Sequence, residues 1–155
     1  MKKLVFIIVI FTLALGIWYG ESRKIYDLGN GEYLTVWKTY NNTCYIIPGK
    51  YYKLLKPFDN YIQTTNDQYL MIYFPNKGNR SLIVRNQGTF GGSKGGYSIV
   101  NNSKEDFKII PYSGKVEENL YKSGATLISD VKQNISYLDI NIKENYAMNQ
   151  HGNRL

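Results

Sequence analysis

Residues 32–38, Glu-Tyr-Leu-Thr-Val-Trp-Lys, carry the clearest structural signal in the chain. Successive side chains of a strand point to opposite faces of a sheet, so the apolar Leu34 and Val36 fall on one face and their chain neighbours on the other. The preceding Gly-Asn-Gly at 29–31 supplies the positive φ angles that a tight hairpin turn requires. This stretch therefore predicts a β-hairpin formed by residues 25–28 and 32–38.

Short apolar runs separated by turn residues continue along the chain, and they are rich in the β-branched and aromatic residues typical of strands. They predict further strands over residues 43–47, 50–55, 61–65, 69–74, 81–85, 97–100 and 107–112. The short link after residue 65 predicts a second hairpin. The continuously apolar residues 70–74 predict a central strand that is covered on both faces.

The spacing of these strands predicts a mainly β (α+β) fold. We expect an antiparallel meander, a half-closed barrel or a small sandwich of about seven short strands. Acidic residues at the start of residues 115–123, and helical spacing of apolar residues to about Tyr137, predict a short C-terminal helix or helices. Yet Leu138, Ile140 and Ile142 alternate as they would in a strand. The expected core consists of Trp37, Ile47, Leu70, Ile72, Phe74, Ile83 and Val84.

Met1-Lys2-Lys3 is followed by 16 uncharged residues from Leu4 to Tyr19. A short basic segment before an apolar run is typical of a secretory signal. The run is slightly short for a membrane anchor, although Trp18 and Tyr19 stand where an interfacial aromatic belt would lie. A cleaved signal, a retained anchor and a buried core helix are the three alternatives. The first two place the remaining chain outside the cytoplasm.

These observations predict three regions. Residues 1–24 form a signal peptide or an N-terminal membrane anchor, residues 25–144 form a single β-rich extracytoplasmic domain, and residues 145–155 form a flexible tail. We expect the protein to be periplasmic, secreted, or membrane-anchored and facing outward. A domain of this length has room for one modest core.

The chain is basic, with 19 Lys and Arg against 12 Asp and Glu and a net charge of +7. Residues 38–94 hold eight basic residues but only Asp59 and Asp67 as acidic ones. A basic segment outside the cytoplasm predicts an anionic envelope polymer, a lipid or a protein as the partner. Export argues against nucleic acid.

The chain lacks the residues of common catalytic centres. His151 is the only histidine and stands in the polar C-terminal segment, whereas Ser-His-Asp and Cys-His machinery needs a histidine held by packing. Cys44 is the only cysteine, so zinc sites of the Cys/His type are not expected. Cys44 lies in an apolar run and is interpreted as a small buried side chain. We therefore predict no catalytic residues, no metal site and no cofactor.

Residues 50–56 combine basic and aromatic side chains beside Pro57. Tyrosine provides both contact area and a hydroxyl group, and it is enriched at interfaces. An edge strand kept soluble by its lysines is the alternative interpretation. The predicted binding residues are Lys50, Tyr51, Tyr52, Lys53 and Lys56.

The sequence thus favours an exported or membrane-anchored β-domain protein of a non-enzymatic binding type, such as an accessory, inhibitor or immunity-like protein. The alternative function is hydrolysis of cell-wall material or polysaccharide by a pair of carboxylates. Asp59 and Asp67 flank the strand predicted at residues 61–65, which is long enough to hold them apart.

Overall fold

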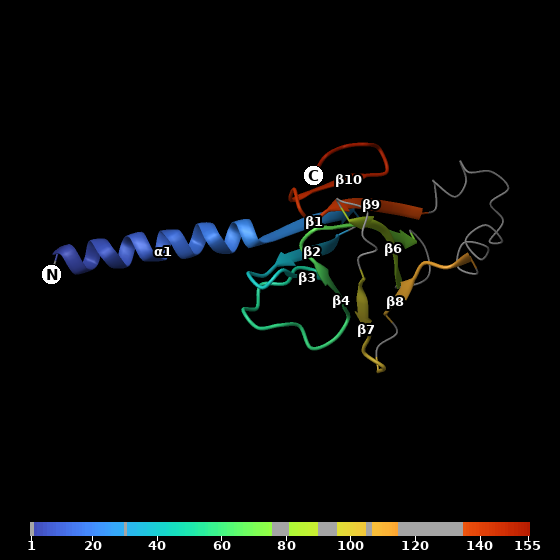
Figure 1. The fold of residues 1–155 in the computed structure, drawn as a ribbon, viewed down its shortest axis with the longest axis horizontal. Coiled ribbons are helices and arrows are strands. Elements are labelled where there is room, and N and C mark those ends of the chain that lie inside the picture. Colours follow the sequence, from blue (N-terminus) through green and yellow to red (C-terminus); the bar gives the residue numbers. More distant parts are fainter. Residues whose placement is uncertain (1, 30, 76–80, 90–95, 105–106, 115–134) are drawn as a thin grey trace.

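The computed structural model describes residues 2–29, 31–75, 81–89, 96–104, 107–114 and 135–155 (Figure 1). The predicted mainly β fold is confirmed. The elements along the chain are α1 (Lys2–Ser22), β1 (Arg23–Gly29), β2 (Glu32–Lys38), β3 (Thr43–Pro48), β4 (Tyr61–Thr65), β5 (Gln68–Pro75), β6 (Ser81–Thr89), β7 (Ser98–Val100), β8 (Lys108–Pro111), β9 (Ile135–Asn141) and β10 (Tyr146–Asn149).

The strands form two five-stranded sheets. The first has the order β1-β2-β3-β4-β7 and the second has the order β10-β9-β5-β6-β8. All neighbouring strands are antiparallel except β6 and β8, which are parallel. Apolar side chains from both sheets meet in one core, including Leu34 and Ile46 from the first sheet and Ile72 and Leu138 from the second. The arrangement is therefore an open two-sheet sandwich rather than a closed barrel.

The faces predicted for β2 are confirmed. Leu34 and Val36 are buried in the core between the sheets, and β2 pairs with β1 as the expected hairpin. Gly31 adopts a φ of 78° in the turn. On the outer face Thr35 is also fully buried, because residues that follow β3 cover it.

Most of the predicted core is confirmed. Buried in the structure are Ile47, Leu70, Ile72, Phe74, Ile83 and Val84. Trp37 is only half-buried and packs outside the main core, on the outer face of the first sheet, against Tyr45 and Tyr51.

Two predictions about the strands are wrong, one about a hairpin and one about a strand at residues 50–55. β4 and β5 do not form a hairpin, because the turn at residues 66–67 carries the chain from the first sheet into the second. The Nδ2 group of Asn66 donates to the carbonyl oxygen of Thr39 at 3.0 Å, which fixes this corner. Residues 50–55 form no strand and instead belong to a loop.

β5 is central in its sheet, as predicted, but it is not buried on both faces. Leu70, Ile72 and Phe74 are buried, whereas Met71 and Tyr73 between them are half-buried. The alternation follows from the sandwich, because only one face of each sheet meets the other sheet.

The C-terminal part of the chain forms two strands. The predicted helices over residues 115–134 lie outside the described residues. The extension of helix to Tyr137 is wrong, since β9 begins at Ile135 and its alternating residues enter the core. Within the predicted tail, β10 pairs with β9 and buries Ala147 completely.

Helix α1 extends away from the two sheets (Figure 1). Eleven large apolar side chains between Leu4 and Trp18 are exposed by 48–66% of their surface. The alternative of a core helix is therefore wrong. Judged over the described residues, no helix combines the length and the hydropathy needed to cross a membrane.

Candidate functional site

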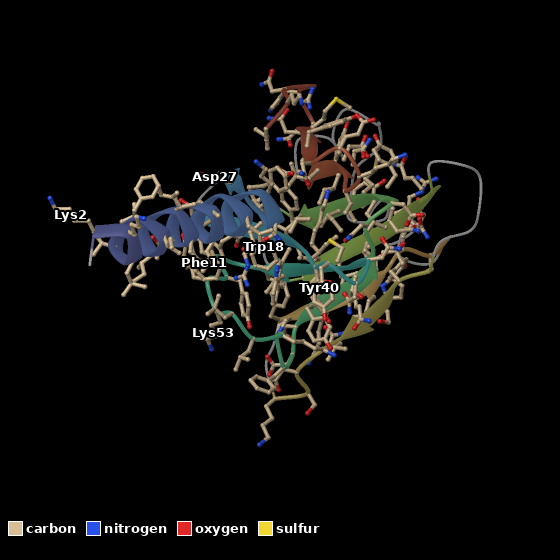
Figure 2. The ribbon with its side chains drawn as sticks, turned by 60° about the vertical axis from the view of Figure 1, so that its left-hand side comes forward. Lys2, Phe11, Trp18, Asp27, Tyr40 and Lys53 are labelled. Carbon is tan, nitrogen blue, oxygen red and sulfur yellow. The ribbon has the colours of Figure 1, made fainter. Side chains whose placement is uncertain are left out.

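The five predicted binding residues lie in the connection between β3 and β4, and we call residues 50–58 the β3–β4 loop. It runs along the outer face of the first sheet, at the end of the sandwich from which α1 projects (Figures 1 and 2). Both views show the loop on this side, and Lys53 points outward from it in Figure 2. The loop is therefore close to the junction of α1 and β1.

The start of the loop is fixed to β2. The backbone N–H of Gly49 donates to the carbonyl oxygen of Tyr33 at 2.7 Å. The hydroxyl of Thr35 donates to the carbonyl oxygen of Gly49 at 2.6 Å and accepts from the backbone N–H of Tyr51 at 3.0 Å. A buried hydroxyl that satisfies both a donor and an acceptor holds the loop backbone at a defined distance from the sheet.

Arg23, the first residue of β1, fixes the middle of the loop. Its Nη1 donates to the carbonyl oxygen of Tyr51 at 3.0 Å, and its Nη2 donates to that of Lys53 at 2.7 Å. Its Cζ atom lies 3.9 Å from the ring centroid of Trp37, a cation–π distance. Nη1 also donates to the hydroxyl of Tyr19 in α1 at 3.1 Å. One side chain thus connects the helix, the sheet and the loop.

Arg23 is only 7% exposed. Burial lowers the pKa of its guanidinium group from the ordinary value, while Tyr19 and Tyr51 act in the opposite direction. Arginine keeps its charge in folded proteins, so Arg23 remains a cation. Its hydrogen bonds to carbonyl oxygens are charge-assisted and stronger than neutral ones.

The end of the loop is fixed to the segment after β7. The side chain of Asn60 accepts a hydrogen bond from the backbone N–H of Asn102 at 2.8 Å. The amide of Asn102 donates to the carboxylate of Asp59 at 2.9 Å. Pro57 is buried. The backbone of the loop is therefore attached at its start and its middle, and the side chains of the two residues that follow its end are held by Asn102.

The predicted binding residues have different environments. Tyr52 and Lys53 are exposed, and their side chains face solvent. Tyr51 is half-buried and stacks on Trp37 with ring centroids 6.2 Å apart. Lys50 and Lys56 are exposed but lie over tyrosine rings. The Nζ of Lys50 is 3.8 Å from the ring centroid of Tyr33, and that of Lys56 is 5.5 Å from the ring centroid of Tyr61. A hydrogen bond that the ammonium group of Lys56 donates to the hydroxyl oxygen of Tyr61 raises the pKa of Lys56.

Sequence reasoning missed three apolar residues of this loop. Leu54, Leu55 and Phe58 are exposed by 76%, 71% and 85%. Two adjacent leucines cannot both point into a core from an extended segment, because neighbouring side chains alternate. The pair Leu54-Leu55 next to Pro57 is the available sequence signal for this exposure, and the strand predicted over residues 50–55 does not account for it.

The cysteine, the histidine and the two aspartates considered for catalysis or metal binding lie outside the β3–β4 loop. Cys44 is completely buried in the core, as predicted, and burial raises the pKa of its thiol to about 12. A hydrogen bond from Thr65 lowers the pKa of Asp67, whereas Asp59 is bonded to Asn102. His151 is exposed. Within the described residues, no three His, Cys, Asp or Glu side chains come together as a metal site.

Comparison of this chain with protein-family models, with curated proteins and with solved structures finds no significant match. Any function must therefore be argued from the residues of this chain.

Proposed function

We propose that this protein is an exported or membrane-anchored β-domain that works by binding, without catalysis, and that the β3–β4 loop contacts an anionic partner of the cell envelope. The observation that carries the proposal is the combination of a fixed backbone and free side chains in this loop. Its backbone is attached to Thr35 and Arg23, and Asn102 holds the side chains of the two residues after it, while Tyr52, Lys53 and the apolar residues beside them stay exposed.

A fixed loop favours binding because little conformational entropy is lost when the partner arrives. Lysines attract an anionic surface and raise the association rate, but their contribution is screened at physiological salt within about 8–10 Å. Tyr52 supplies contact area that excludes water. We therefore expect Tyr52 to determine the dissociation rate and Lys53 to determine the association rate.

The proposal of export is supported by the basic N-terminus before the uncharged run at residues 4–19. The structure also contains a cation-rich loop next to the end of that run. An extracytoplasmic envelope offers anionic polymers, lipids and proteins that such a loop would meet.

Affinity capture from an envelope extract tests the proposal, using the full chain in detergent. Tyr52→Ala should weaken capture about tenfold or more, as expected for an aromatic residue at the centre of an interface. Tyr40→Ala is the matched control, because Tyr40 is 94% exposed and lies in the turn between β2 and β3. Tyr40→Ala should leave capture unchanged.

A second pair of variants separates charge from contact area. Lys53→Gln should slow association and reduce the salt dependence, whereas Lys104→Gln, an exposed control outside the loop, should not. Equal capture by the parent chain, Tyr52→Ala and Lys53→Gln would show that the loop only keeps the protein soluble.

A further inference from the structure

We infer that the β3–β4 loop contacts the surface of an anionic lipid bilayer, beside the point at which α1 enters the lipid. This inference rests on the membrane-anchored form of the proposed function, in which α1 is retained, and narrows the partner to one chemical class, anionic phospholipid.

The first observation is where exposed apolar side chains gather. Exposed large hydrophobic residues of the described chain belong either to α1 or to the β3–β4 loop, apart from Tyr40 and Leu155. Isolated exposed apolar residues are normal on soluble proteins, whereas a concentration of them marks an interaction site. Among the described residues, most of the large exposed apolar side chains therefore lie at one end of the molecule.

The second observation is that the loop is attached to the base of α1. The hydroxyl of Tyr19 donates to the carbonyl oxygen of Tyr52 at 2.8 Å. Arg23 joins Tyr19 to the carbonyl oxygens of Tyr51 and Lys53. The loop is therefore attached beside the last turn of α1.

The third observation concerns the part of α1 that would lie in the headgroup region of the membrane. Its apolar side chains lie on all sides of the helix, so they need an apolar surrounding rather than a single partner face. Trp18 and Tyr19 stand at the end of the apolar run, and such aromatic residues prefer the headgroup region. The β3–β4 loop is attached beside this level of the helix.

The composition of the loop suits this level. Leu54, Leu55 and Phe58 are apolar and exposed, and they would enter the boundary between headgroups and acyl chains. Lys53, beside them, would face the phosphates, since basic residues next to the membrane are attracted by anionic lipids. A protein or a carbohydrate polymer would use the lysines but would not explain the neighbouring apolar helix.

The test measures the position of the loop in the full chain, because α1 alone would hold the protein on a vesicle. Leu54→Cys is labelled with a polarity-sensitive fluorophore, and Tyr40→Cys provides the control position. The native Cys44 is fully buried, so the unsubstituted chain should take up little label under native conditions. The proteins are placed in vesicles of phosphatidylcholine, with or without phosphatidylglycerol.

We expect the label at position 54, but not at position 40, to shift its emission to the blue in vesicles with phosphatidylglycerol. We also expect it to become severalfold less accessible to a quencher in the water phase. Lys53→Gln should reduce this protection. Equal protection in neutral vesicles would overturn the role assigned to anionic headgroups, and equal accessibility at positions 54 and 40 would overturn lipid contact altogether.

The same label distinguishes this inference from the proposed function. If lipid leaves position 54 accessible but a lipid-free envelope extract protects it, the lipid inference fails and the binding function stands. If neither protects it, both fail.

Discussion

At the scale of single residues, Cys44 makes the free energy of unfolding of the sandwich fall at alkaline pH. The thiol is buried in the core, and burial raises its pKa to about 12, against about 8.5 in an unfolded chain. The unfolded state therefore loses this proton at a lower pH than the folded state. The contribution of Cys44 to stability is complete below about pH 8.5 and is lost as the pH rises toward about 12.

Cys44→Ala should reduce this alkaline loss. The free energy of unfolding of the full chain, measured by denaturant titration at a series of pH values, should fall less steeply for the variant. The difference in slope is expected to approach about 1.4 kcal/mol per pH unit over that interval. Tyr26→Phe is the companion variant, since burial also raises the pKa of Tyr26 to about 12. Parallel slopes for the parent and Cys44→Ala would show that the thiol is accessible to solvent.

At the scale of secondary-structure elements, β5 is the strand on which the second sheet depends, because it pairs with both β6 and β9. Ile72 lies at its centre and is fully buried. Ile72→Ala should lower the free energy of unfolding by about 2–5 kcal/mol, through lost burial and the cavity left behind. Met71→Ala, on the half-buried outer face, should cost clearly less. A loss below about 0.5 kcal/mol for Ile72→Ala would place this residue at the surface.

The same elements show how far sequence reasoning reaches. The alternation of apolar and polar side chains was sufficient to predict the two faces of β2. One face lies in the core and the other does not, and the residue types differ accordingly. It was not sufficient for β4 and β5, since a two-residue link is compatible both with a hairpin and with a corner between sheets. Only the packing of Leu70 and Ile72 against Leu34 and Ile46 decides between them. In β9 the helical spacing and the alternation coincided over a few residues, and tertiary contacts favoured the strand.

The candidate site stays a prediction from the sequence, whereas the contacts that hold it are seen only in the structure. The mixture of lysine and tyrosine identified residues 50–56, whereas the role of Arg23 was not visible, because it depends on a contact between residues 28 and 30 positions apart. The exposure of Phe58 could not be predicted either, since a single apolar residue is assigned to a core by default.

At the scale of the whole molecule, the apolar helix and the β3–β4 loop lie together at one end, and the sandwich extends from the other side of the junction (Figure 1). We expect a reporter enzyme that functions only outside the cytoplasm to be active when fused after Leu155. Ile8→Arg should abolish this activity by placing a charge in the apolar run, whereas Ile8→Val should preserve it. An inactive reporter on a soluble cytoplasmic protein would contradict export.

The hydrogen bonds of Arg23 to the loop have one more consequence. Both loop acceptors are main-chain carbonyl oxygens, so the bond at Lys53 does not depend on which side chain stands there, whereas the side chain of Tyr51 also holds the loop through Trp37 and Leu55. The residues that hold the loop in place are therefore largely different from the residues that would contact a partner. Residues 52–54 can be exchanged for a segment of equal length with another preference while Arg23, Thr35 and Tyr51 keep the loop in place, which makes this loop a suitable position for grafting new specificities.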